Sequence, residues 1–406
     1  MCRLFLLMKN SYRLLIVTLL TAFLLNACDS KSEQAPTVEV GKTYRFATFN
    51  IAMGLENYGD MAAALTSGED SRLLDLAKVL QIVRPEVVLL AEFDYDPAVD
   101  AAELLNSNYL QNADEGLQPI SYAYSFRPTV NTGAGSGLDI DQNGKLGDPG
   151  DAWGFGRFPG QYGMLILSMH PIDVTSVRSF QSLLWKDLPD AHRPVDEGGQ
   201  SHYPDEIWNA LRLSSKNHVD LPIDLDGKTV HFLVSHPTPP VFDGPEDRNG
   251  KRNHDEIALW SHFISQDAKP WMIDDIGQAG GLAQGADFII AGDLNADPVD
   301  GDANPGAIDL LLKNERVDSS CIPTSRGGAE ATETQAGINL QHDGNPAQDT
   351  SDFNDETVGN YRLDYVLPSS NLNVEGCGVF WPASDEPHHG LTDFSDHRLV
   401  WLDIAR

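Results

Sequence analysis

Short apolar runs alternate with helical stripes along most of the chain. Residues 71–83 place Leu73, Leu76 and Leu80 at helical spacing, and Pro85 ends this pattern. The next run, 86–91, is apolar after its first residue, which is typical of a buried strand. Further strands are predicted at 44–51, 163–168, 231–235, 287–291, 361–367 and 399–402, and further helices at 253–264 and 307–312. Strands that are separated by helices and long loops predict an α/β fold with mixed sheets.

The first 27 residues have a different character. Their charges are Arg3, Lys9 and Arg13, and an apolar run follows at 14–25. This pattern predicts a signal peptide. A membrane span is the alternative, but the 12-residue run is shorter than the roughly 20 residues that a spanning helix needs.

The end of this segment, Leu25-Asn26-Ala27-Cys28, resembles a bacterial lipobox. It predicts cleavage before Cys28 and a lipid on the Cys28 thiol, which would be the only attachment to the membrane. Residues 28–42 would then form a polar tether, and residues 43–406 the folded domain. The expected location is the cell envelope, on its periplasmic or extracellular face.

Charge and cysteine content narrow the possible functions. The 406 residues include 60 Asp and Glu against 28 Lys and Arg, a net charge of -32, or -35 without the three cations of the signal segment. Such a surface argues against a protein that coats nucleic acid by charge alone, but a bound divalent cation could still hold phosphate locally. In an oxidising compartment Cys321 and Cys377 are expected to form a disulfide, with two separate buried thiols as the alternative.

Polar residues recur at or near the ends of the predicted strands. They are Asn50, Glu92, His236, Asp293 and Asp396. Side chains at strand ends allow a rigid sheet to direct several groups into one cleft. Strand alternation would place Asp293 and Asn295 on one face, where they could orient a water molecule; an Asx turn is the alternative.

A further carboxylate lies inside an apolar strand. Asp364 is flanked by Leu363 and Tyr365, and a buried carboxylate needs a partner. An imidazole is a suitable partner because the carboxylate fixes its tautomer and raises its basicity. We therefore predict that Asp364 pairs with His397.

Six short segments occur in an order that resembles the endonuclease/exonuclease/phosphatase family, whose fold is that of deoxyribonuclease I. They are Phe49-Asn-Ile51, Leu90-Ala-Glu92, Ser235-His-Pro237, Gly292-Asp-Leu-Asn295, Arg362-Leu-Asp-Tyr365 and Ser395-Asp-His397. Residues 162–168 also look like the family's strand around a Gly-x-x-x-x-Ser pattern. The resemblance extends from about Tyr44 to Leu402, nearly the whole mature chain.

The resemblance implies a four-layer sandwich, with two mixed β-sheets packed face to face and helices outside. It also implies a site for Mg²⁺ or Mn²⁺ with Glu92 as the main ligand and Asn50 and Asp396 nearby. Asp293 would align or deprotonate the attacking water, with help from Asn295. His236 and His397 would stabilise charge on the phosphoryl oxygens, and His397 could also transfer a proton.

The chain departs from the family pattern most clearly in an acidic, Gly-rich insertion at about 129–161. Within it, Asp139-Ile-Asp141-Gln-Asn143-Gly144 matches the start of a Ca²⁺-binding loop, which Asp148 or Asp151 could complete. A solvated acidic turn is the alternative. The other departures are Ala91 before Glu92 and the proline-rich segment after His236. These departures concern the substrate more than the chemistry.

Basic and histidine-containing segments leave further alternatives open. Arg252 could contact a second phosphate or merely belong to a surface loop before a helix. Arg212, Ser214, Lys216 and His218 alternate along one strand face, which could line the cleft or face water. His388 and His389 could bind a second metal, although exposed loop histidines are the simpler interpretation.

The sequence therefore predicts a monomeric, membrane-tethered metal-dependent hydrolase of phosphate esters. An endonuclease that uses the same site is the first alternative, with nucleic acid as substrate. A non-catalytic calcium-binding lipoprotein is the second. The presence of the full set of metal-binding and water-positioning side chains argues against the non-catalytic alternative.

Overall fold

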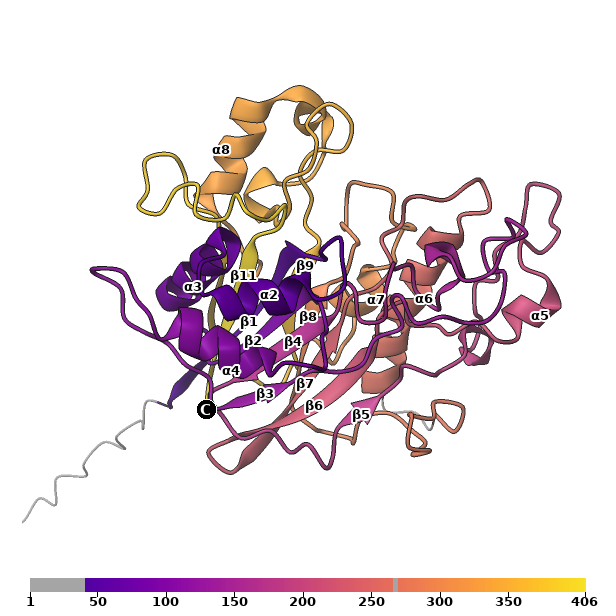
Figure 1. Ribbon diagram of the computed structural model, residues 1–406, viewed down its shortest axis with the longest axis horizontal. Coiled ribbons are helices and arrows are strands. Elements are labelled where there is room, and N and C mark those ends of the chain that lie inside the picture. The colour runs from indigo at the N-terminus through magenta and orange to yellow at the C-terminus, as the bar shows by residue number, and fades with distance from the viewer. Residues whose placement is uncertain (1–40, 266–268) are drawn as a thin grey trace, which may run out of the picture. The chain divides into compact units, whose positions relative to one another are not determined.

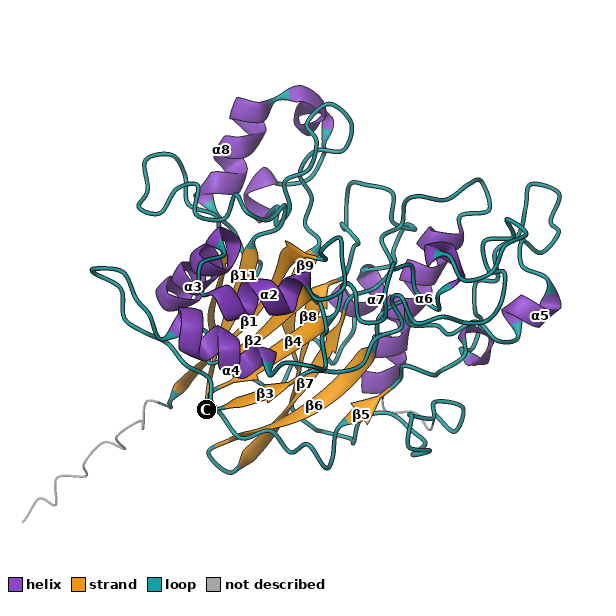
Figure 2. Cartoon of the chain, viewed as in Figure 1, coloured by secondary structure: helices purple, strands orange, loops and turns teal. Residues whose placement is uncertain are grey.

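Two mixed β-sheets form the centre of the computed structural model, which describes residues 41–265 and 269–406 (Figures 1 and 2). The predicted signal segment, Cys28 and the tether up to residue 40 lie outside the described residues. Within the described ranges, no helix is both long and apolar enough to cross a membrane.

The first sheet has the strand order β10-β11-β1-β2-β4-β3. Its strands are β1 (Thr43–Met53), β2 (Val87–Phe93), β3 (Tyr124–Phe126), β4 (Met164–Ser168), β10 (Asn373–Phe380) and β11 (Leu399–Ala405). β1 and β2 are parallel, and the other pairs are antiparallel.

The second sheet has the order β5-β6-β7-β8-β9. It consists of β5 (Arg178–Ser179), β6 (His218–Leu225), β7 (Lys228–Ser235), β8 (Phe288–Asp293) and β9 (Asp364–Pro368). Only β7 and β8 are parallel in this sheet. The mixed sheets that the sequence predicted are therefore present.

Three apolar clusters separate four layers. One cluster joins the facing sides of the two sheets, where the rings of Phe46 and Phe232 lie 5.5 Å apart. A second packs the outer face of the first sheet against α2 (Asp60–Ser67), α3 (Ser71–Val83), α4 (Ala101–Leu105) and the π-helix η1 (Asn106–Leu110). The third packs the second sheet against α6 (Arg248–Ile264), α7 (Asp309–Leu312) and η3 (Trp185–Asp187). The predicted sandwich is confirmed.

Strand alternation explains how β1 serves two layers. Tyr44 and Phe46 face the other sheet, whereas Ala47 and Phe49 pack under the helices. The same period of two places Asn50 on the side that faces the second sheet. The polar end of β1 is thereby directed into the seam between the sheets.

Several elements lie beyond those that the sequence predicted. They include α2, β3, β5, β6, β10, α5 (Asp205–Trp208), α8 (Arg326–Gln335) and the short 3₁₀ turns η2 (Pro149–Asp151), η4 (Gly337–Gln341) and η5 (Pro346–Gln348). The helix predicted at 253–264 also begins earlier, at Arg248. Most of these elements are short or carry polar residues on one face, so their apolar pattern is weak.

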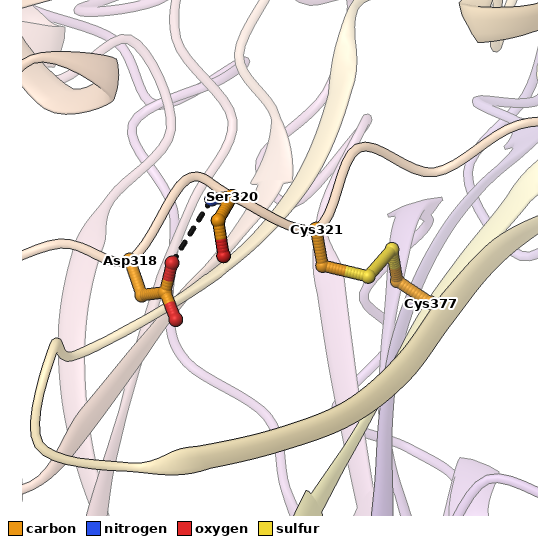
Figure 3. Close-up of a disulfide and its surroundings, with 4 residues drawn as sticks. All are labelled: Asp318, Ser320, Cys321 and Cys377. Atoms are coloured by element: carbon orange, nitrogen blue, oxygen red, sulfur yellow. Dashed lines mark hydrogen bonds between the residues drawn. A yellow bond between two sulfur atoms is a disulfide. The ribbon is translucent and has the colours of Figure 1, made fainter.

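A disulfide joins Cys321 to Cys377, which decides between the two alternatives of paired and separate cysteines (Figure 3). Cys377 lies on β10, and Cys321 lies in the segment between α7 and α8. Beside it, the backbone N–H of Ser320 donates to Oδ1 of Asp318 at 2.9 Å. The bond fixes this long segment to the edge strand of the first sheet.

Candidate active site

The carboxylate of Asp293 lies at the centre of a buried polar cluster. Its Oδ2 lies 3.0 Å from Nδ2 of Asn50, 3.3 Å from Nε2 of His236 and 3.6 Å from Nε2 of His397. All four side chains are at least nine-tenths buried. The contact between Asn50 and Asp293 shows that the polar ends of β1 and β8 meet at one edge of the sandwich. Because β2 is parallel to β1, and β7 to β8, the polar ends of these strands lie at the same edge. The fold thus brings together residues that are far apart in sequence.

Asp293 is held by its own turn. β8 ends at Asp293, and the backbone N–H of Asn295 donates to Oδ1 of Asp293 at 3.0 Å. Asn295 itself has a left-handed backbone with φ 51° and donates from Nδ2 to the carbonyl of Pro237 at 3.2 Å. The strand alternation that we expected to align the two side chains therefore stops at Asp293. The Asx turn, considered as the alternative, keeps them adjacent.

Gly292 allows the two parallel strands to meet here. A Cβ atom at this position would lie 2.0 Å from the carbonyl oxygen of Ser235, the last residue of β7. Any side chain would force β7 and β8 apart. The glycine therefore sets the distance between His236 and Asp293.

His397 makes the predicted pair with Asp364. Its Nδ1 lies 2.8 Å from Oδ2 of Asp364, which also accepts a 2.8 Å hydrogen bond from the hydroxyl of Thr350. Burial alone would lower the pKa of His397, but the carboxylates of Asp364 and Asp293 outweigh it and raise the pKa to about 10. At neutral pH this imidazole is therefore protonated and can donate from Nε2.

The electrostatics of Asp293 and His236 differ from those of His397. Burial raises the pKa of Asp293 to about 6, although the neighbouring His397 counteracts the shift. Burial, together with the charges of Lys216 and His397, holds the pKa of His236 well below its usual value. Near neutral pH the site therefore contains a carboxylate, a neutral imidazole and an imidazolium.

Glu92 provides carboxylate oxygen atoms beside this cluster. Asn50 directs its amide nitrogen toward the cluster, and its Oδ1 accepts from the backbone N–H of Ala52 at 3.1 Å. Nδ2 of Asn50 lies 3.3 Å from Oε1 of Glu92. Burial raises the pKa of Glu92, and the nearby charges of Lys216 and His397 oppose this rise. Glu92 and Ala52 both have left-handed backbones, with φ 55° and 49°. Such strained conformations are often found at functional sites, where the surrounding structure holds them in place.

Asp396 is the third predicted metal ligand, and it is exposed. Its negative charge raises the pKa values of both Glu92 and His397. Carboxylate and amide oxygens are the ligands that Mg²⁺ prefers in proteins. Glu92, Asn50 and Asp396 have side-chain oxygens of the chemical kind that such a cation takes, and their role as its ligands remains a prediction.

A comparison with protein families shows the family to which this chain belongs. A model of the endonuclease/exonuclease/phosphatase family matches residues 47–397, most of the chain. The chain belongs to this family. No curated protein matches the sequence.

Solved structures of the family resemble this one. A protein of the family from Beutenbergia cavernae is 17% identical, with 90% of this chain and 72% of that chain covered and a TM-score of 0.48. One from Leptotrichia buccalis is 14% identical, with coverage of 89% and 100% and a TM-score of 0.45. A beta toxin of Staphylococcus aureus with bound magnesium ions is 16% identical, with coverage of 90% and 100% and a TM-score of 0.44. These identities are low, so the family assignment rests on the family model.

Lys216 is a site residue that the sequence left undecided. It lies two residues before β6, is 6% exposed, and its charge acts on Glu92, Asp293 and Glu256. Burial lowers its pKa, and these three carboxylates oppose the shift. Its ammonium form, which these carboxylates favour, is suited to bind an anion. The three other residues of the alternating segment, Arg212, Ser214 and His218, have partners outside the proposed active site. Arg212 donates to Oδ1 of Asn131, and Ser214 is paired with His218.

The guanidinium group of Arg252 makes its hydrogen bonds to the main chain. Its Nε donates to the carbonyl of Leu213, and its Nη2 donates to those of Trp153, Arg212 and Ser214. Main-chain carbonyls thus engage two of its three guanidinium nitrogens, and the phosphate contact remains a prediction. Arg252 instead attaches the insertion to the segment that leads into β6.

The insertion brings together three carboxylates, those of Asp139, Asp141 and Asp151, with ligand atoms within 4.8 Å of one another. Oδ1 of Asp139 is buried without a hydrogen-bond partner. Asp148, one of the two residues that we expected could complete the loop, accepts from the backbone N–H of Gly150 at 3.0 Å and from Nδ2 of Asn143 at 2.6 Å. Asp151 belongs to the carboxylate cluster, and calcium binding remains a prediction.

His388 and His389 are exposed, in agreement with the simpler interpretation that they are loop histidines.

Proposed function

We propose that this chain is an exported, membrane-tethered, divalent-metal-dependent phosphoesterase. The observation that carries the proposal is the contact of the Asp293 carboxylate with Asn50, His236 and His397. Asp293 as a base, the neutral imidazole of His236 and the cationic imidazole of His397 then lie close together. This combination suits the attack of water on a phosphate ester.

In the proposed reaction a water oxygen attacks phosphorus in line with the leaving oxygen. Asp293 accepts a proton from the water as the new P–O bond forms, and the bond to the leaving oxygen breaks. Nε2 of His236 and Nε2–H of His397 donate to phosphoryl oxygens, and His397 can give its proton to the leaving oxygen. Asp364 keeps the His397 ring oriented. No covalent intermediate with the protein forms.

Glu92, Asn50 and Asp396 would hold the divalent cation, Mg²⁺ or Mn²⁺. When bound, the cation supplies positive charge that draws electron density from the phosphoryl group. Lys216, in its ammonium form, would add a positive charge on the protein side. Its ammonium group is suited to a non-bridging phosphoryl oxygen.

The substrate that we favour is a small or exposed phosphate ester. The net charge of -32 opposes the broad electrostatic contact that a duplex requires. A local contact could still hold a nucleic acid, so an endonuclease is the second candidate.

A substrate panel distinguishes the two. The purified chain is incubated with a simple phosphodiester, a phosphomonoester, DNA and sphingomyelin, each with and without Mg²⁺ or Ca²⁺. Metal-dependent turnover of a small ester above that of DNA supports the proposal, whereas DNA cleavage alone supports the endonuclease.

The cellular location is proposed from the N-terminal sequence. A lipid on Cys28 and a short tether would hold the domain at the cell envelope. Mass spectrometry of the mature N-terminus tests this: a diacylglyceryl-modified Cys28 supports the anchor, and an intact Met1 refutes it.

A further inference from the structure

A further group of side chains that could hold a metal ion has no residue in common with the proposed active site. It consists of His192, His254 and Asp255, whose ligand atoms lie within 4.8 Å of one another. His192 lies in the segment between η3 and α5, whereas His254 and Asp255 are consecutive residues of α6. The three residues therefore join a long loop to a helix.

The two oxygen atoms of Asp255 have different environments. Oδ2 accepts from Nε1 of the buried Trp185 at 2.6 Å and from the backbone N–H of His192 at 2.7 Å. Oδ1 faces two imidazole nitrogens, Nδ1 of His192 at 2.6 Å and Nδ1 of His254 at 3.0 Å. The bonds to Oδ2 already hold the loop on the helix. The two imidazole contacts at Oδ1 are therefore not required to hold the loop on the helix.

The carboxylate of Asp255 is kept ionised. Burial would raise the pKa of this 1% exposed residue, but hydrogen bonds from His254, His192 and Trp185 outweigh burial and lower the pKa. The two rings stand edge to face with centroids 4.4 Å apart. Within the described chain, neither Nε2 has a recorded hydrogen bond.

The group is also open to an ion from solvent. The side chain of His192 is 49% exposed and that of His254 is 21% exposed, while that of Asp255 is 2% exposed. A fixed carboxylate with two accessible imidazoles is a donor set of nitrogen and oxygen atoms that Zn²⁺ and similar ions prefer. Mg²⁺ would instead favour oxygen ligands alone.

We propose that His192, His254 and Asp255 bind one divalent transition-metal ion of the Zn²⁺ class, at a site separate from catalysis. Water would complete its coordination. The ion would fasten the loop that contains His192 to α6.

The opposite side of α6 supports the active site. Nδ2 of Asn253 donates to the carbonyls of Thr238, Leu294 and Asn295. The carboxylate of Glu256 accepts from the backbone N–H groups of Ser215 and Thr238. An ion that steadies this helix would therefore steady the loops after β7 and β8.

The test measures zinc on the full chain with Mg²⁺ in excess, so that a magnesium site remains occupied. The chain is stripped with chelator, and bound Zn²⁺ is counted by equilibrium dialysis with elemental analysis. The double variant His192→Gln/His254→Gln is compared with His388→Gln/His389→Gln, which removes two exposed histidines elsewhere. Circular dichroism and thermal melting without zinc check that both variants fold.

The proposal predicts that the wild-type chain and the control variant bind one Zn²⁺ more than the double variant. The affinity of this site should fall by more than about a hundredfold in the double variant, because even outer partners of metal ligands contribute tenfold to hundredfold. Equal zinc binding by all three proteins would overturn it.

A second readout does not depend on how the double variant folds. Co²⁺ bound to the wild-type chain should give visible d–d bands typical of mixed nitrogen and oxygen ligation. The single variant Asp255→Asn should reduce these bands, and Zn²⁺ should displace them. Absence of such bands would show that the histidines only make hydrogen bonds to Asp255.

Discussion

Nδ2 of Asn50 donates to Oδ2 of Asp293 across 3.0 Å, although 243 positions separate the two residues. Asn50 belongs to the first sheet and Asp293 to the second. The contact therefore joins the two sheets at the edge where their polar strand ends meet. The proposed chemistry depends on this junction, and the following predictions test its parts.

Asp293→Asn should nearly abolish turnover while metal still binds. The amide retains the shape of the carboxylate but cannot accept the proton of the attacking water. We therefore expect kcat to fall by a factor on the order of hundreds. Steady-state kinetics on a small phosphodiester measure this loss. Asp226→Asn, at an exposed carboxylate, should leave kcat unchanged. A variant at Asp293 with near wild-type kcat would exclude Asp293 as the base.

Lys216→Met should weaken the interaction with the phosphoryl group of the substrate without unfolding the protein. Loss of a charged hydrogen bond to a phosphoryl oxygen should lower kcat/KM by about 10- to 100-fold. Arg212→Met is the matched control, since Arg212 lies over the ring of Trp153 and bonds to Asn131. If both variants lose activity equally, Lys216 has no specific role in the site.

Stability should decrease below pH 6.5 because of His218. Its ring is buried between the hydroxyl of Ser214 and the carbonyl of Glu256, and burial lowers its pKa from 6.5 to about 4. As the pH falls from 6.5 to 4, the unfolded chain takes up a proton that the folded chain excludes, so unfolding becomes easier. The contribution is about 3 kcal/mol at most.

Urea unfolding at pH 7 and at pH 4.5 measures this effect. His218→Gln should lower stability at pH 7 but show a smaller further loss at pH 4.5 than the wild-type chain. An identical pH dependence in both proteins would contradict the assignment to His218.

Calcium should protect the insertion from protease. An ion among Asp139, Asp141 and Asp151 would order a segment that is rich in glycine and acidic residues. Limited proteolysis with and without millimolar Ca²⁺ measures protection, and Asp141→Asn should weaken it. Cleavage of the insertion at the same rate with and without Ca²⁺ would leave a solvated acidic turn as the correct interpretation.

Buried strands and the groups at their ends were predictable from the sequence. The apolar strand around Asp364 indicated a buried carboxylate, and the structure pairs it with His397 as predicted. The order of the strand-end motifs likewise indicated that Asn50, His236 and Asp293 converge. These inferences hold because an apolar strand fixes which residues are buried and which lie at its ends.

Contacts with the main chain were not predictable in this way. Arg252 and Asp148 looked available for a phosphate and an ion, but carbonyl and amide groups of distant or irregular segments engage them. The alternating polar pattern around Lys216 could not show which face is buried, because that depends on how the insertion packs. A sequence pattern shows which side chains are present. The partners of these side chains depend on main-chain groups that the tertiary structure brings close to them.

The central claim is that a divalent cation, held by Glu92 and its neighbours, enables hydrolysis at Asp293. Its most direct test is the turnover of a small phosphodiester by the wild-type chain and Glu92→Ala, with Mg²⁺ or with chelator, and with Glu56→Ala as an exposed control. We expect turnover only with Mg²⁺, and a joint loss of Mg²⁺ binding and turnover in Glu92→Ala but not in Glu56→Ala. Full activity in chelator, or a fully active Glu92→Ala, would contradict it.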